Sequence, residues 1–325
     1  MQALSDPAIL FFIFGVFAGL VKSNLEIPPA ISRFLALYLL MALGLKGGFA
    51  LAHSGLTTQV ATSLLCAVAL AIAIPAMGYT VLRKFLAPFD AAAVAATYGS
   101  VSAVTFITAV QYMESKQLPF GGHMAAAMAL MESPAIIMAV IWANVLRNRQ
   151  ASASNSQAAQ SNATPLGKVL HESLTDGAQL LLLGAMVVGI VSGDAGKTAM
   201  QPFSGDLFKG MLSFFLLDMG LLAARNMPQL KGQSPWMFVY GIAGPVVHAT
   251  LALGLALLTG MAAGDAALLM VLAASASYIA VPAVLRFAMP EANASLYFGM
   301  SLGITLPLNI LLGIPAYVAI AHWAI

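Results

Sequence analysis

The sequence predicts an all-α polytopic membrane protein, with ten transmembrane helices arranged as two inverted five-helix repeats. Of its 325 residues, 60% are hydrophobic and only 8% are charged, whereas roughly a quarter of a soluble domain is charged. Apolar windows long enough to cross a bilayer recur along the chain. Motifs of the first half also return in the second, as Asp90 is matched by Asp265 at a spacing of 175 residues.

Windows of about 20 apolar residues mark ten spans. They are expected near 7–21, 28–51, 57–82, 90–112, 120–146, 174–192, 202–224, 234–259, 265–288 and 294–322. The polar stretch 147–168 is rich in Ser, Asn, Gln and Ala, which is typical of a flexible linker. It separates a first repeat, 1–146, from a second, 169–325. Because five crossings are an odd number, the second repeat must be inverted.

Basic residues in the loops predict the orientation. The loops after odd-numbered spans, the linker among them, hold more Lys and Arg than those after even-numbered spans. The latter hold Lys46, Lys116, Lys197 and Lys209. By the positive-inside rule the linker is cytoplasmic and both termini lie outside, in a plasma (inner) membrane. The first apolar stretch has no basic segment before it, so we expect a span rather than a cleaved signal.

The fourth and ninth spans are expected to be broken helices. Ser100 and Ser102 directly follow the helix-weakening Gly99, and Ser275 and Ser277 precede a proline. Interrupted helices at corresponding positions of two halves indicate the substrate site of a secondary transporter. Their exposed N-terminal ends favour an anion. The alternative is that each hydroxyl bonds back to its own preceding turn, which is less expected for two matched pairs than for one serine.

Two acids and a histidine fall within apolar spans. A carboxylate at Glu132 costs about 2.5–3.5 kcal/mol to insert, which makes it a candidate sodium ligand or proton carrier. The alternative is a buried protonated acid or one near a helix end. Thr305 is its counterpart in the tenth span. Asp218 faces either the bundle or a subunit contact, and His248 is interpreted as structural rather than titrating.

The sequence lacks the signals of an enzyme. It contains no H-E-x-x-H, no phosphate-binding loop and no G-x-S-x-G elbow. A net charge of +2 is too small for a nucleic-acid partner. Cys66 is the single cysteine, so an intrachain disulfide is excluded.

Over nearly its whole length the chain resembles the SbtA-type sodium-dependent bicarbonate symporters. The resemblance is carried by Ile27-Pro28, Gly44-Leu45, Gly99, Val101-Ser102, Thr105, Glu114-Ser115, Pro134-Ala135, Ala143-Asn144, Pro245, His248, Ala273-Ala274-Ser275, Ser277, Pro282, Leu285-Arg286, Ala292-Asn293 and Pro307. Their order and spacing together are specific, although no single motif is.

The resemblance implies bicarbonate as substrate, sodium (Na+) as coupling ion, a homotrimer in membrane lipid and a PII-like cytoplasmic regulator. Together with the serine pairs it gives a substrate site of Gly99, Ser100, Ser102, Ser275, Ser277 and Tyr278. The metal site is expected at Ser102, Thr105, Glu132 and Thr305. Tyr278 stands where the family usually has an acid. The linker is short and carries no charge between 150 and 167, which argues against the regulator.

We therefore expect a sodium-coupled secondary transporter that imports a small anion, bicarbonate first, by alternating access. Two alternatives stay open. One is a sodium- or proton-coupled carrier of an organic anion, because Tyr278 could line a larger pocket. The other is a membrane sensor or partner-docking module that does not transport.

Overall fold

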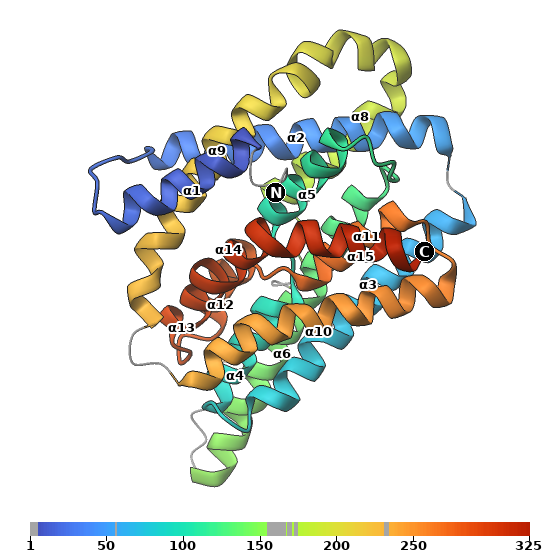
Figure 1. Cartoon of the computed structure of the whole chain (residues 1–325). Coiled ribbons are helices and arrows are strands. Elements are labelled where there is room, and N and C mark those ends of the chain that lie inside the picture. The colour runs from blue at the N-terminus through green and yellow to red at the C-terminus, as the bar shows by residue number, and fades with distance from the viewer. Residues whose placement is uncertain (1–5, 56, 155–166, 168–170, 172–174, 231–233) are drawn as a thin grey trace.

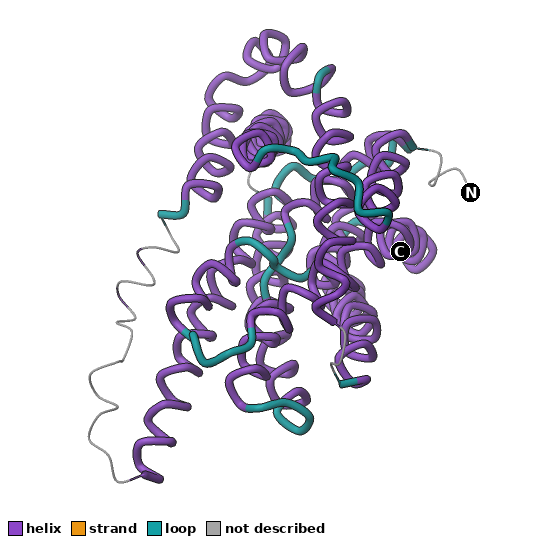
Figure 2. Tube along the Cα trace, turned by 90° about the vertical axis from the view of Figure 1, so that its left-hand side faces the viewer, coloured by secondary structure: helices purple, strands orange, loops and turns teal. Residues whose placement is uncertain are grey.

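A computed structural model of the protein describes residues 6–55, 57–154, 167, 171, 175–230 and 234–325. Throughout this described part the regular elements are helices, joined by short loops (Figure 1, Figure 2). The predicted all-α class is confirmed. Most of the predicted linker lies outside the described residues.

The helix bounds follow the predicted spans closely. In the first half they are α1 (Pro7–Leu20), α2 (Pro29–Ser54), α3 (Thr58–Leu82), α4 (Pro88–Gly99), α5 (Ala103–Ser115) and α6 (Met124–Ser154). The second half holds α8 (Gly177–Met200), η3 (Gln201–Asp206), α9 (Phe208–Asn226), η4 (Met227–Leu230), α10 (Pro235–Thr259), α11 (Ala263–Ala274), α12 (Ala280–Ala288), α13 (Ala294–Met300), η5 (Ser301–Thr305), α14 (Leu306–Leu308), η6 (Asn309–Gly313) and α15 (Ile314–Ala324). Several helices begin at proline, which suits the first helical position because its missing N–H needs no partner there.

Seven helical stretches of the described chain are long and apolar enough to cross a membrane. One of them, 177–226, has 50 residues, more than twice the length that one crossing needs. It is kinked at Gly193, whose φ is 55°, close to the predicted end of the sixth span at 192. The regular helix therefore stops beside that predicted end, and the residues from the kink to Met200 form a second helical segment of α8. The protein is a polytopic helical membrane protein.

The helices pack as two groups. The first bundle consists of α1, α2, α8, η3 and α9, in which α2 lies along α8 and α1 along α9 (Figure 1). The second bundle consists of α3 to α6 and α10 to α15. Contacts between the two bundles are sparser than the contacts within each bundle. A movement of one bundle against the other would therefore disturb less packing than a rearrangement inside either bundle.

Small residues set the close packing of the first bundle. A Cβ on Gly15 would overlap the carbonyl of Leu217, and one on Gly44 would overlap the carbonyl of Leu182. Glycine at these positions lets the backbones of neighbouring helices touch, as is common between membrane helices.

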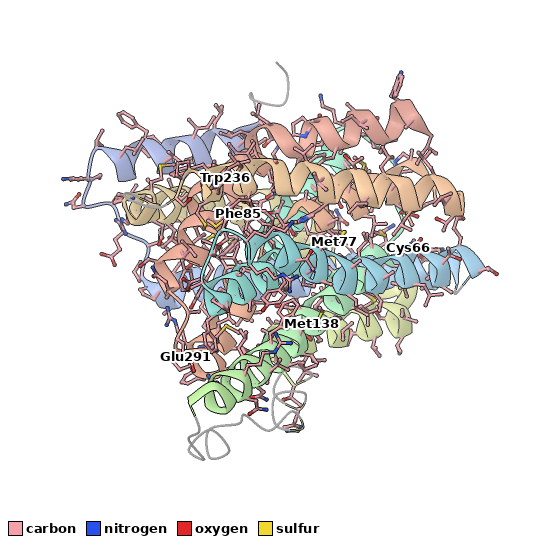
Figure 3. The ribbon with its side chains drawn as sticks, turned by 90° about the horizontal axis from the view of Figure 1, so that it is seen from below. Cys66, Met77, Phe85, Met138, Trp236 and Glu291 are labelled. Carbon is pink, nitrogen blue, oxygen red and sulfur yellow. The ribbon has the colours of Figure 1, made fainter. Side chains whose placement is uncertain are left out.

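Helix α6 extends beyond the predicted fifth span, so the beginning of the predicted linker is helical to Ser154. Arg147 explains part of this extension. Its guanidinium donates to Glu291 Oε1 at 2.7 Å, to Glu291 Oε2 at 2.8 Å and to the Ala288 carbonyl at 2.8 Å. Glu291 thereby holds the C-terminal part of α6 to the loop between α12 and α13 (Figure 3).

This ion pair makes stability depend on pH. The Arg147 guanidinium, by hydrogen bonding, lowers the pKa of Glu291. A carboxyl group with a lowered folded-state pKa stabilises the fold above its unfolded pKa, and that stabilisation is lost as pH falls through the folded value. We expect the native chain to unfold at a higher temperature than Glu291→Gln at pH 7, and the difference to shrink below about pH 4. A difference that stays constant from neutral to acid pH would contradict this role.

Candidate functional site

The two predicted helix breaks are present, and they contact each other. The chain leaves α4 after Gly99 and starts α5 at Ala103, with Ser100 extended between them. It likewise leaves α11 at an extended Ser275 and starts α12 at Ala280. The Ser102 N–H donates to Ser275 Oγ at 2.9 Å, so the breaks cross within the second bundle.

A second hydrogen bond completes the crossing. The Ser277 N–H donates to the Thr97 carbonyl at 2.8 Å. Each broken helix therefore satisfies one backbone N–H of its break through the other helix, as buried backbone donors require.

Packing explains why the first break lies where it does. A Cβ on Gly99 would stand 2.5 Å from Pro75 Cβ and 2.7 Å from Pro75 Cδ. The rigid pyrrolidine ring of α3 therefore requires glycine at the end of α4. In the second break, Pro282 occupies the first turn of α12, where its missing N–H costs no intrahelical bond.

The four serine hydroxyls have unequal roles. Ser102 Oγ accepts the Thr105 N–H at 3.2 Å, and Ser277 Oγ accepts the Val281 N–H at 3.3 Å. Ser102 is thus the N-cap of α5, whereas Ser277 lies two residues before the N-cap of α12 and accepts an N–H from the first turn of that helix.

Ser100 and Ser275 occupy matching positions but differ. Ser275 Oγ accepts the Ser102 N–H and donates to the Leu272 carbonyl at 2.8 Å. Ser100 Oγ has no hydrogen-bond partner in the described structure, although its residue is only 1% exposed. A buried hydroxyl without a partner is costly, so Ser100 is the group of the crossing best placed to bind a ligand.

Tyr278 covers the crossing toward the first bundle. Its hydroxyl lies 3.4 Å from Met219 Sδ of α9 and also interacts with the Ser102 side chain. The ring is 7% exposed. The crossing therefore meets the bundle interface at Tyr278.

Sequence reasoning missed Asn309. Its Nδ2 donates to the Ala274 carbonyl at 2.8 Å, directly before the second break. Its Oδ1 has no partner within the described part of the chain, and the residue is 1% exposed. An amide inside an apolar span was the signal that could have found it. It lies in η6, a π-helical segment of the kind often found at functional sites.

The predicted metal ligands are only partly brought together. Thr105 is buried one turn after Ser102, to which its N–H donates. Glu132 Oε2 instead accepts from Gln179 Nε2 of α8 at 2.8 Å, across the bundle interface. Thr305 Oγ1 lies 2.6 Å from Tyr98 Oη and donates to the Gly241 carbonyl at 3.0 Å, so its hydroxyl orients α4 against α10.

Asp218 and His248, the other two intramembrane polar residues singled out from the sequence, each have a contact with a neighbouring helix. Asp218 Oδ2 accepts a hydrogen bond from Ser32 Oγ, which joins α9 to α2 inside the first bundle. His248 is 3% exposed and interacts with the backbone of Ala273 beside the second break. Asp218 therefore faces its own bundle and not a subunit contact. The contact of His248 agrees with a structural role for that residue.

The matched aspartates have matched roles. Asp90 Oδ1 accepts the Asn293 N–H at 2.8 Å, and Asp265 Oδ1 accepts the Gly121 N–H at 2.6 Å. Each begins a broken helix of one half and holds a loop of the other. His123 Nε2 also lies 3.6 Å from Asp265 Oδ2.

A buried polar centre between two crossing interrupted helices of a polytopic protein is typical of transporters. The chain belongs to the Na+-dependent bicarbonate transporter superfamily, whose family model matches residues 7–322. A search of curated proteins gives no match. The protein is therefore a transporter and not an enzyme, as its sequence predicts.

Proposed function

We propose that the protein imports bicarbonate together with sodium by alternating access. The observation that carries this proposal is the unpartnered, buried hydroxyl of Ser100 at the crossing. Its O–H is available to donate to an anion beside the start of α5. The first N–H groups of a helix have no intrahelical partner, and the helix dipole favours negative charge there.

The surroundings favour a small anion. We propose that Gly99, Ser100, Ser102, Ser275, Ser277 and Tyr278 form the substrate site. Tyr278 already interacts with Ser102 and Met219, so it closes the site instead of lining a larger pocket. This packing supports bicarbonate over the organic anion alternative.

We propose that sodium binds to oxygen atoms on the α5 side of the crossing, from Ser102 and Thr105. The Asn309 Oδ1 is an additional candidate, because it is an acceptor that lacks a partner and η6 contacts both α5 and α11. A hard cation prefers such oxygen ligands. Glu132, which lies at the bundle interface, would attract the cation through its charge. Thr305 would position Tyr98 through its hydroxyl.

We also propose the ten-span inverted repeat, with halves 1–146 and 169–325. Two matched sets of contacts support it. Asp90 and Asp265 each hold a loop of the opposite half, and Ser102 and Ser277 each accept an N–H from the first turn of the helix after a break. The ten crossings include α1, the two parts of 177–226, and α11 joined to α12.

Localisation and assembly rest on other arguments. The loop charges support outside termini in a plasma (inner) membrane, and the family resemblance supports a homotrimer. The short linker, which carries no charged residue between 150 and 167, speaks against a PII-like regulator. The two bundles would supply the alternating access, one moving against the other.

Uptake by the purified protein tests the proposed function. Proteoliposomes should accumulate radiolabelled bicarbonate when an inward sodium gradient is applied, and far less with choline in place of sodium. Competition by formate, acetate and larger carboxylates measures the size limit. Uptake driven by protons without sodium, or strong competition by large organic anions, would replace this proposal with the alternative carrier.

Replacing Glu132 tests its role in coupling. Glu132→Gln removes the charge that would attract the cation, so we expect the sodium concentration for half-maximal uptake to rise about fivefold to tenfold. Gln179→Ala is the matched control, because it removes the partner at 2.8 Å but keeps the carboxylate. An unchanged sodium dependence in Glu132→Gln would remove Glu132 from the coupling site.

A further inference from the structure

A cavity of about 510 Å³ lies between the two bundles. Helix α2 and η3 line it from the first bundle, and α5 with the start of α6 lines it from the second. It is located at the N-terminal end of α6, whereas the predicted linker follows the C-terminal end of that helix.

The cavity reaches toward the crossing along α5. Phe106, Val110 and Glu114 line it at a spacing of four residues, so they share one face of that helix. The Phe106 N–H donates to the Ser102 carbonyl, which places Phe106 in the first turn. The cavity lining therefore begins about 6 Å along the helix from the first break.

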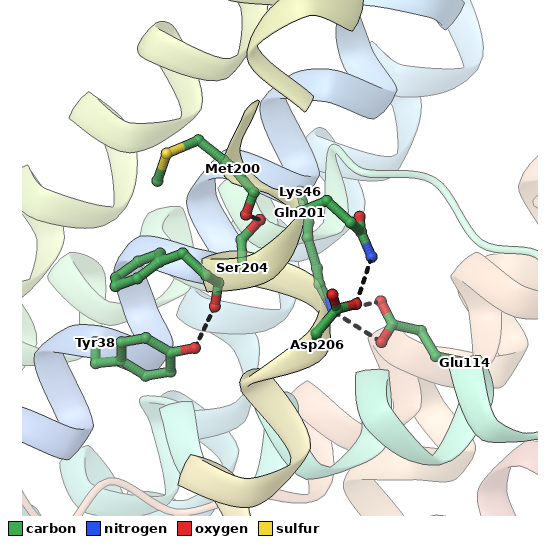
Figure 4. Close-up of polar contacts among 8 residues, drawn as sticks. Tyr38, Lys46, Glu114, Met200, Gln201, Ser204 and Asp206 are labelled. Atoms are coloured by element: carbon green, nitrogen blue, oxygen red, sulfur yellow. Dashed lines mark hydrogen bonds and ion pairs between the residues drawn. The ribbon is translucent and has the colours of Figure 1, made fainter. Parts of the chain in front are cut away.

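An ion pair crosses this cavity. Lys46 Nζ of α2 lies 3.0 Å from Glu114 Oε1 and 2.9 Å from Glu114 Oε2 of α5 (Figure 4). The Lys46 and Glu114 side chains are 24% and 32% exposed. The ammonium also lies 4.1 Å from the centre of the Phe208 ring. Lys46 thus contacts the Phe208 ring of its own bundle and the Glu114 carboxylate of the other bundle.

The same cavity holds more cations than acids. Its lining includes Lys46, Lys197 and Lys209 against Glu114 and Asp206. Lys209 pairs with Asp6 at 2.9 Å, and both belong to the first bundle or its N-terminal flank. Lys46 differs, because its counter-charge lies on the other bundle. If the bundles separated, Lys46 would lose its counter-charge, whereas Lys209 would keep Asp6.

We propose that the Lys46–Glu114 ion pair is a gate and that Lys46 is an anion-receiving residue. With the bundles together, Glu114 neutralises Lys46 and closes the cavity. With the bundles apart, the Lys46 ammonium binds the incoming anion before the anion reaches Ser100. This inference rests on the proposed function, which supplies bicarbonate as the anion.

Single charge removals separate a gate from a purely structural pair. Lys46→Gln removes the receiving charge, so the bicarbonate concentration for half-maximal uptake should rise about tenfold. Glu114→Gln leaves Lys46 without its competitor, so that concentration should fall. Lys209→Gln is the matched control, a lysine of the same cavity whose partner does not cross the interface, and it should change little. Shifts in the same direction for Lys46→Gln and Glu114→Gln, or an equal shift for Lys209→Gln, would overturn the proposal.

Cross-linking tests the movement directly. In a Cys66→Ala background, which removes the only native cysteine, Lys46→Cys is combined with Glu114→Cys and the two thiols are joined by a short bis-methanethiosulfonate reagent. Uptake should stop and should return when a reductant cleaves the link. The control pair Asp6→Cys and Lys209→Cys, joined in the same way, should leave uptake intact. Normal uptake by the protein linked between 46 and 114 would overturn the gate.

Failure of the transport proposal would look different. The native chain would then take up no bicarbonate, and the gate would be judged from the cross-linking rate alone. That rate at 46 and 114 should differ about threefold or more between sodium and choline, because a bound ion shifts the population of bundle positions. Equal rates in the two salts would overturn the gate.

Discussion

Ser100→Ala is expected to reduce sodium-driven bicarbonate uptake at least about tenfold while the protein still folds. The Ser100 hydroxyl has no partner in the described structure, so its removal leaves no protein group unsatisfied. A hydrogen bond to a charged ligand contributes about 1.5–3 kcal/mol, which corresponds to roughly a tenfold to hundredfold change in binding. Uptake kinetics and thermal unfolding of the purified variant measure the two quantities separately.

The matched control is Ser63→Ala. Ser63 is also 1% exposed, but its Oγ donates to the Gln59 carbonyl of its own helix at 2.9 Å. It should keep uptake near the native level. Ser275→Ala should lower both stability and uptake, because Ser275 Oγ bonds Ser102 and Leu272. Native uptake by Ser100→Ala would show that the anion binds elsewhere.

Gly99→Ala is expected to abolish most uptake and to lower the unfolding temperature. The new methyl group would meet the Pro75 ring at 2.5–2.7 Å. The ring is rigid, so α3 and α4 must separate, and such overpacking typically costs about 1–3 kcal/mol. Moving α4 also displaces Ser100 and the Thr97 carbonyl, which accepts a hydrogen bond from the Ser277 N–H.

A second glycine isolates this steric effect. Gly254 lies in α10, and a Cβ there meets no described atom within 4 Å. Gly254→Ala should be neutral or should stabilise the helix by up to about 1 kcal/mol, because alanine is the better helix former. If Gly99→Ala had the same unfolding temperature and the same uptake as Gly254→Ala, close packing on Pro75 would not define the break.

The breaks themselves were predictable from sequence, because their causes are local. Glycine at position 99 weakens the helix, and proline at position 282 is best accommodated in the first turn of a helix. The distinct role of Ser100 was not predictable. It depends on Ser102 reaching Ser275 and on Ser277 reaching Thr97, which are contacts between halves far apart in sequence.

Loop and helix assignments limited the prediction of charged residues. Lys46 was assigned to a loop, but it lies inside α2 and pairs with Glu114. Arg147 was placed at the start of the linker and instead lies in α6, held by Glu291. Hydropathy marks where an apolar window ends, whereas tertiary ion pairs decide how far the helix continues.

Electron cryo-microscopy of the protein in lipid nanodiscs, with sodium bicarbonate and separately with sodium chloride, tests the crossing as an anion site. The bicarbonate sample should show added density between the two breaks, about 3 Å from Ser100 Oγ. The chloride sample should lack a density of that shape. Bicarbonate density elsewhere, with both maps unchanged around Ser100, would contradict the account.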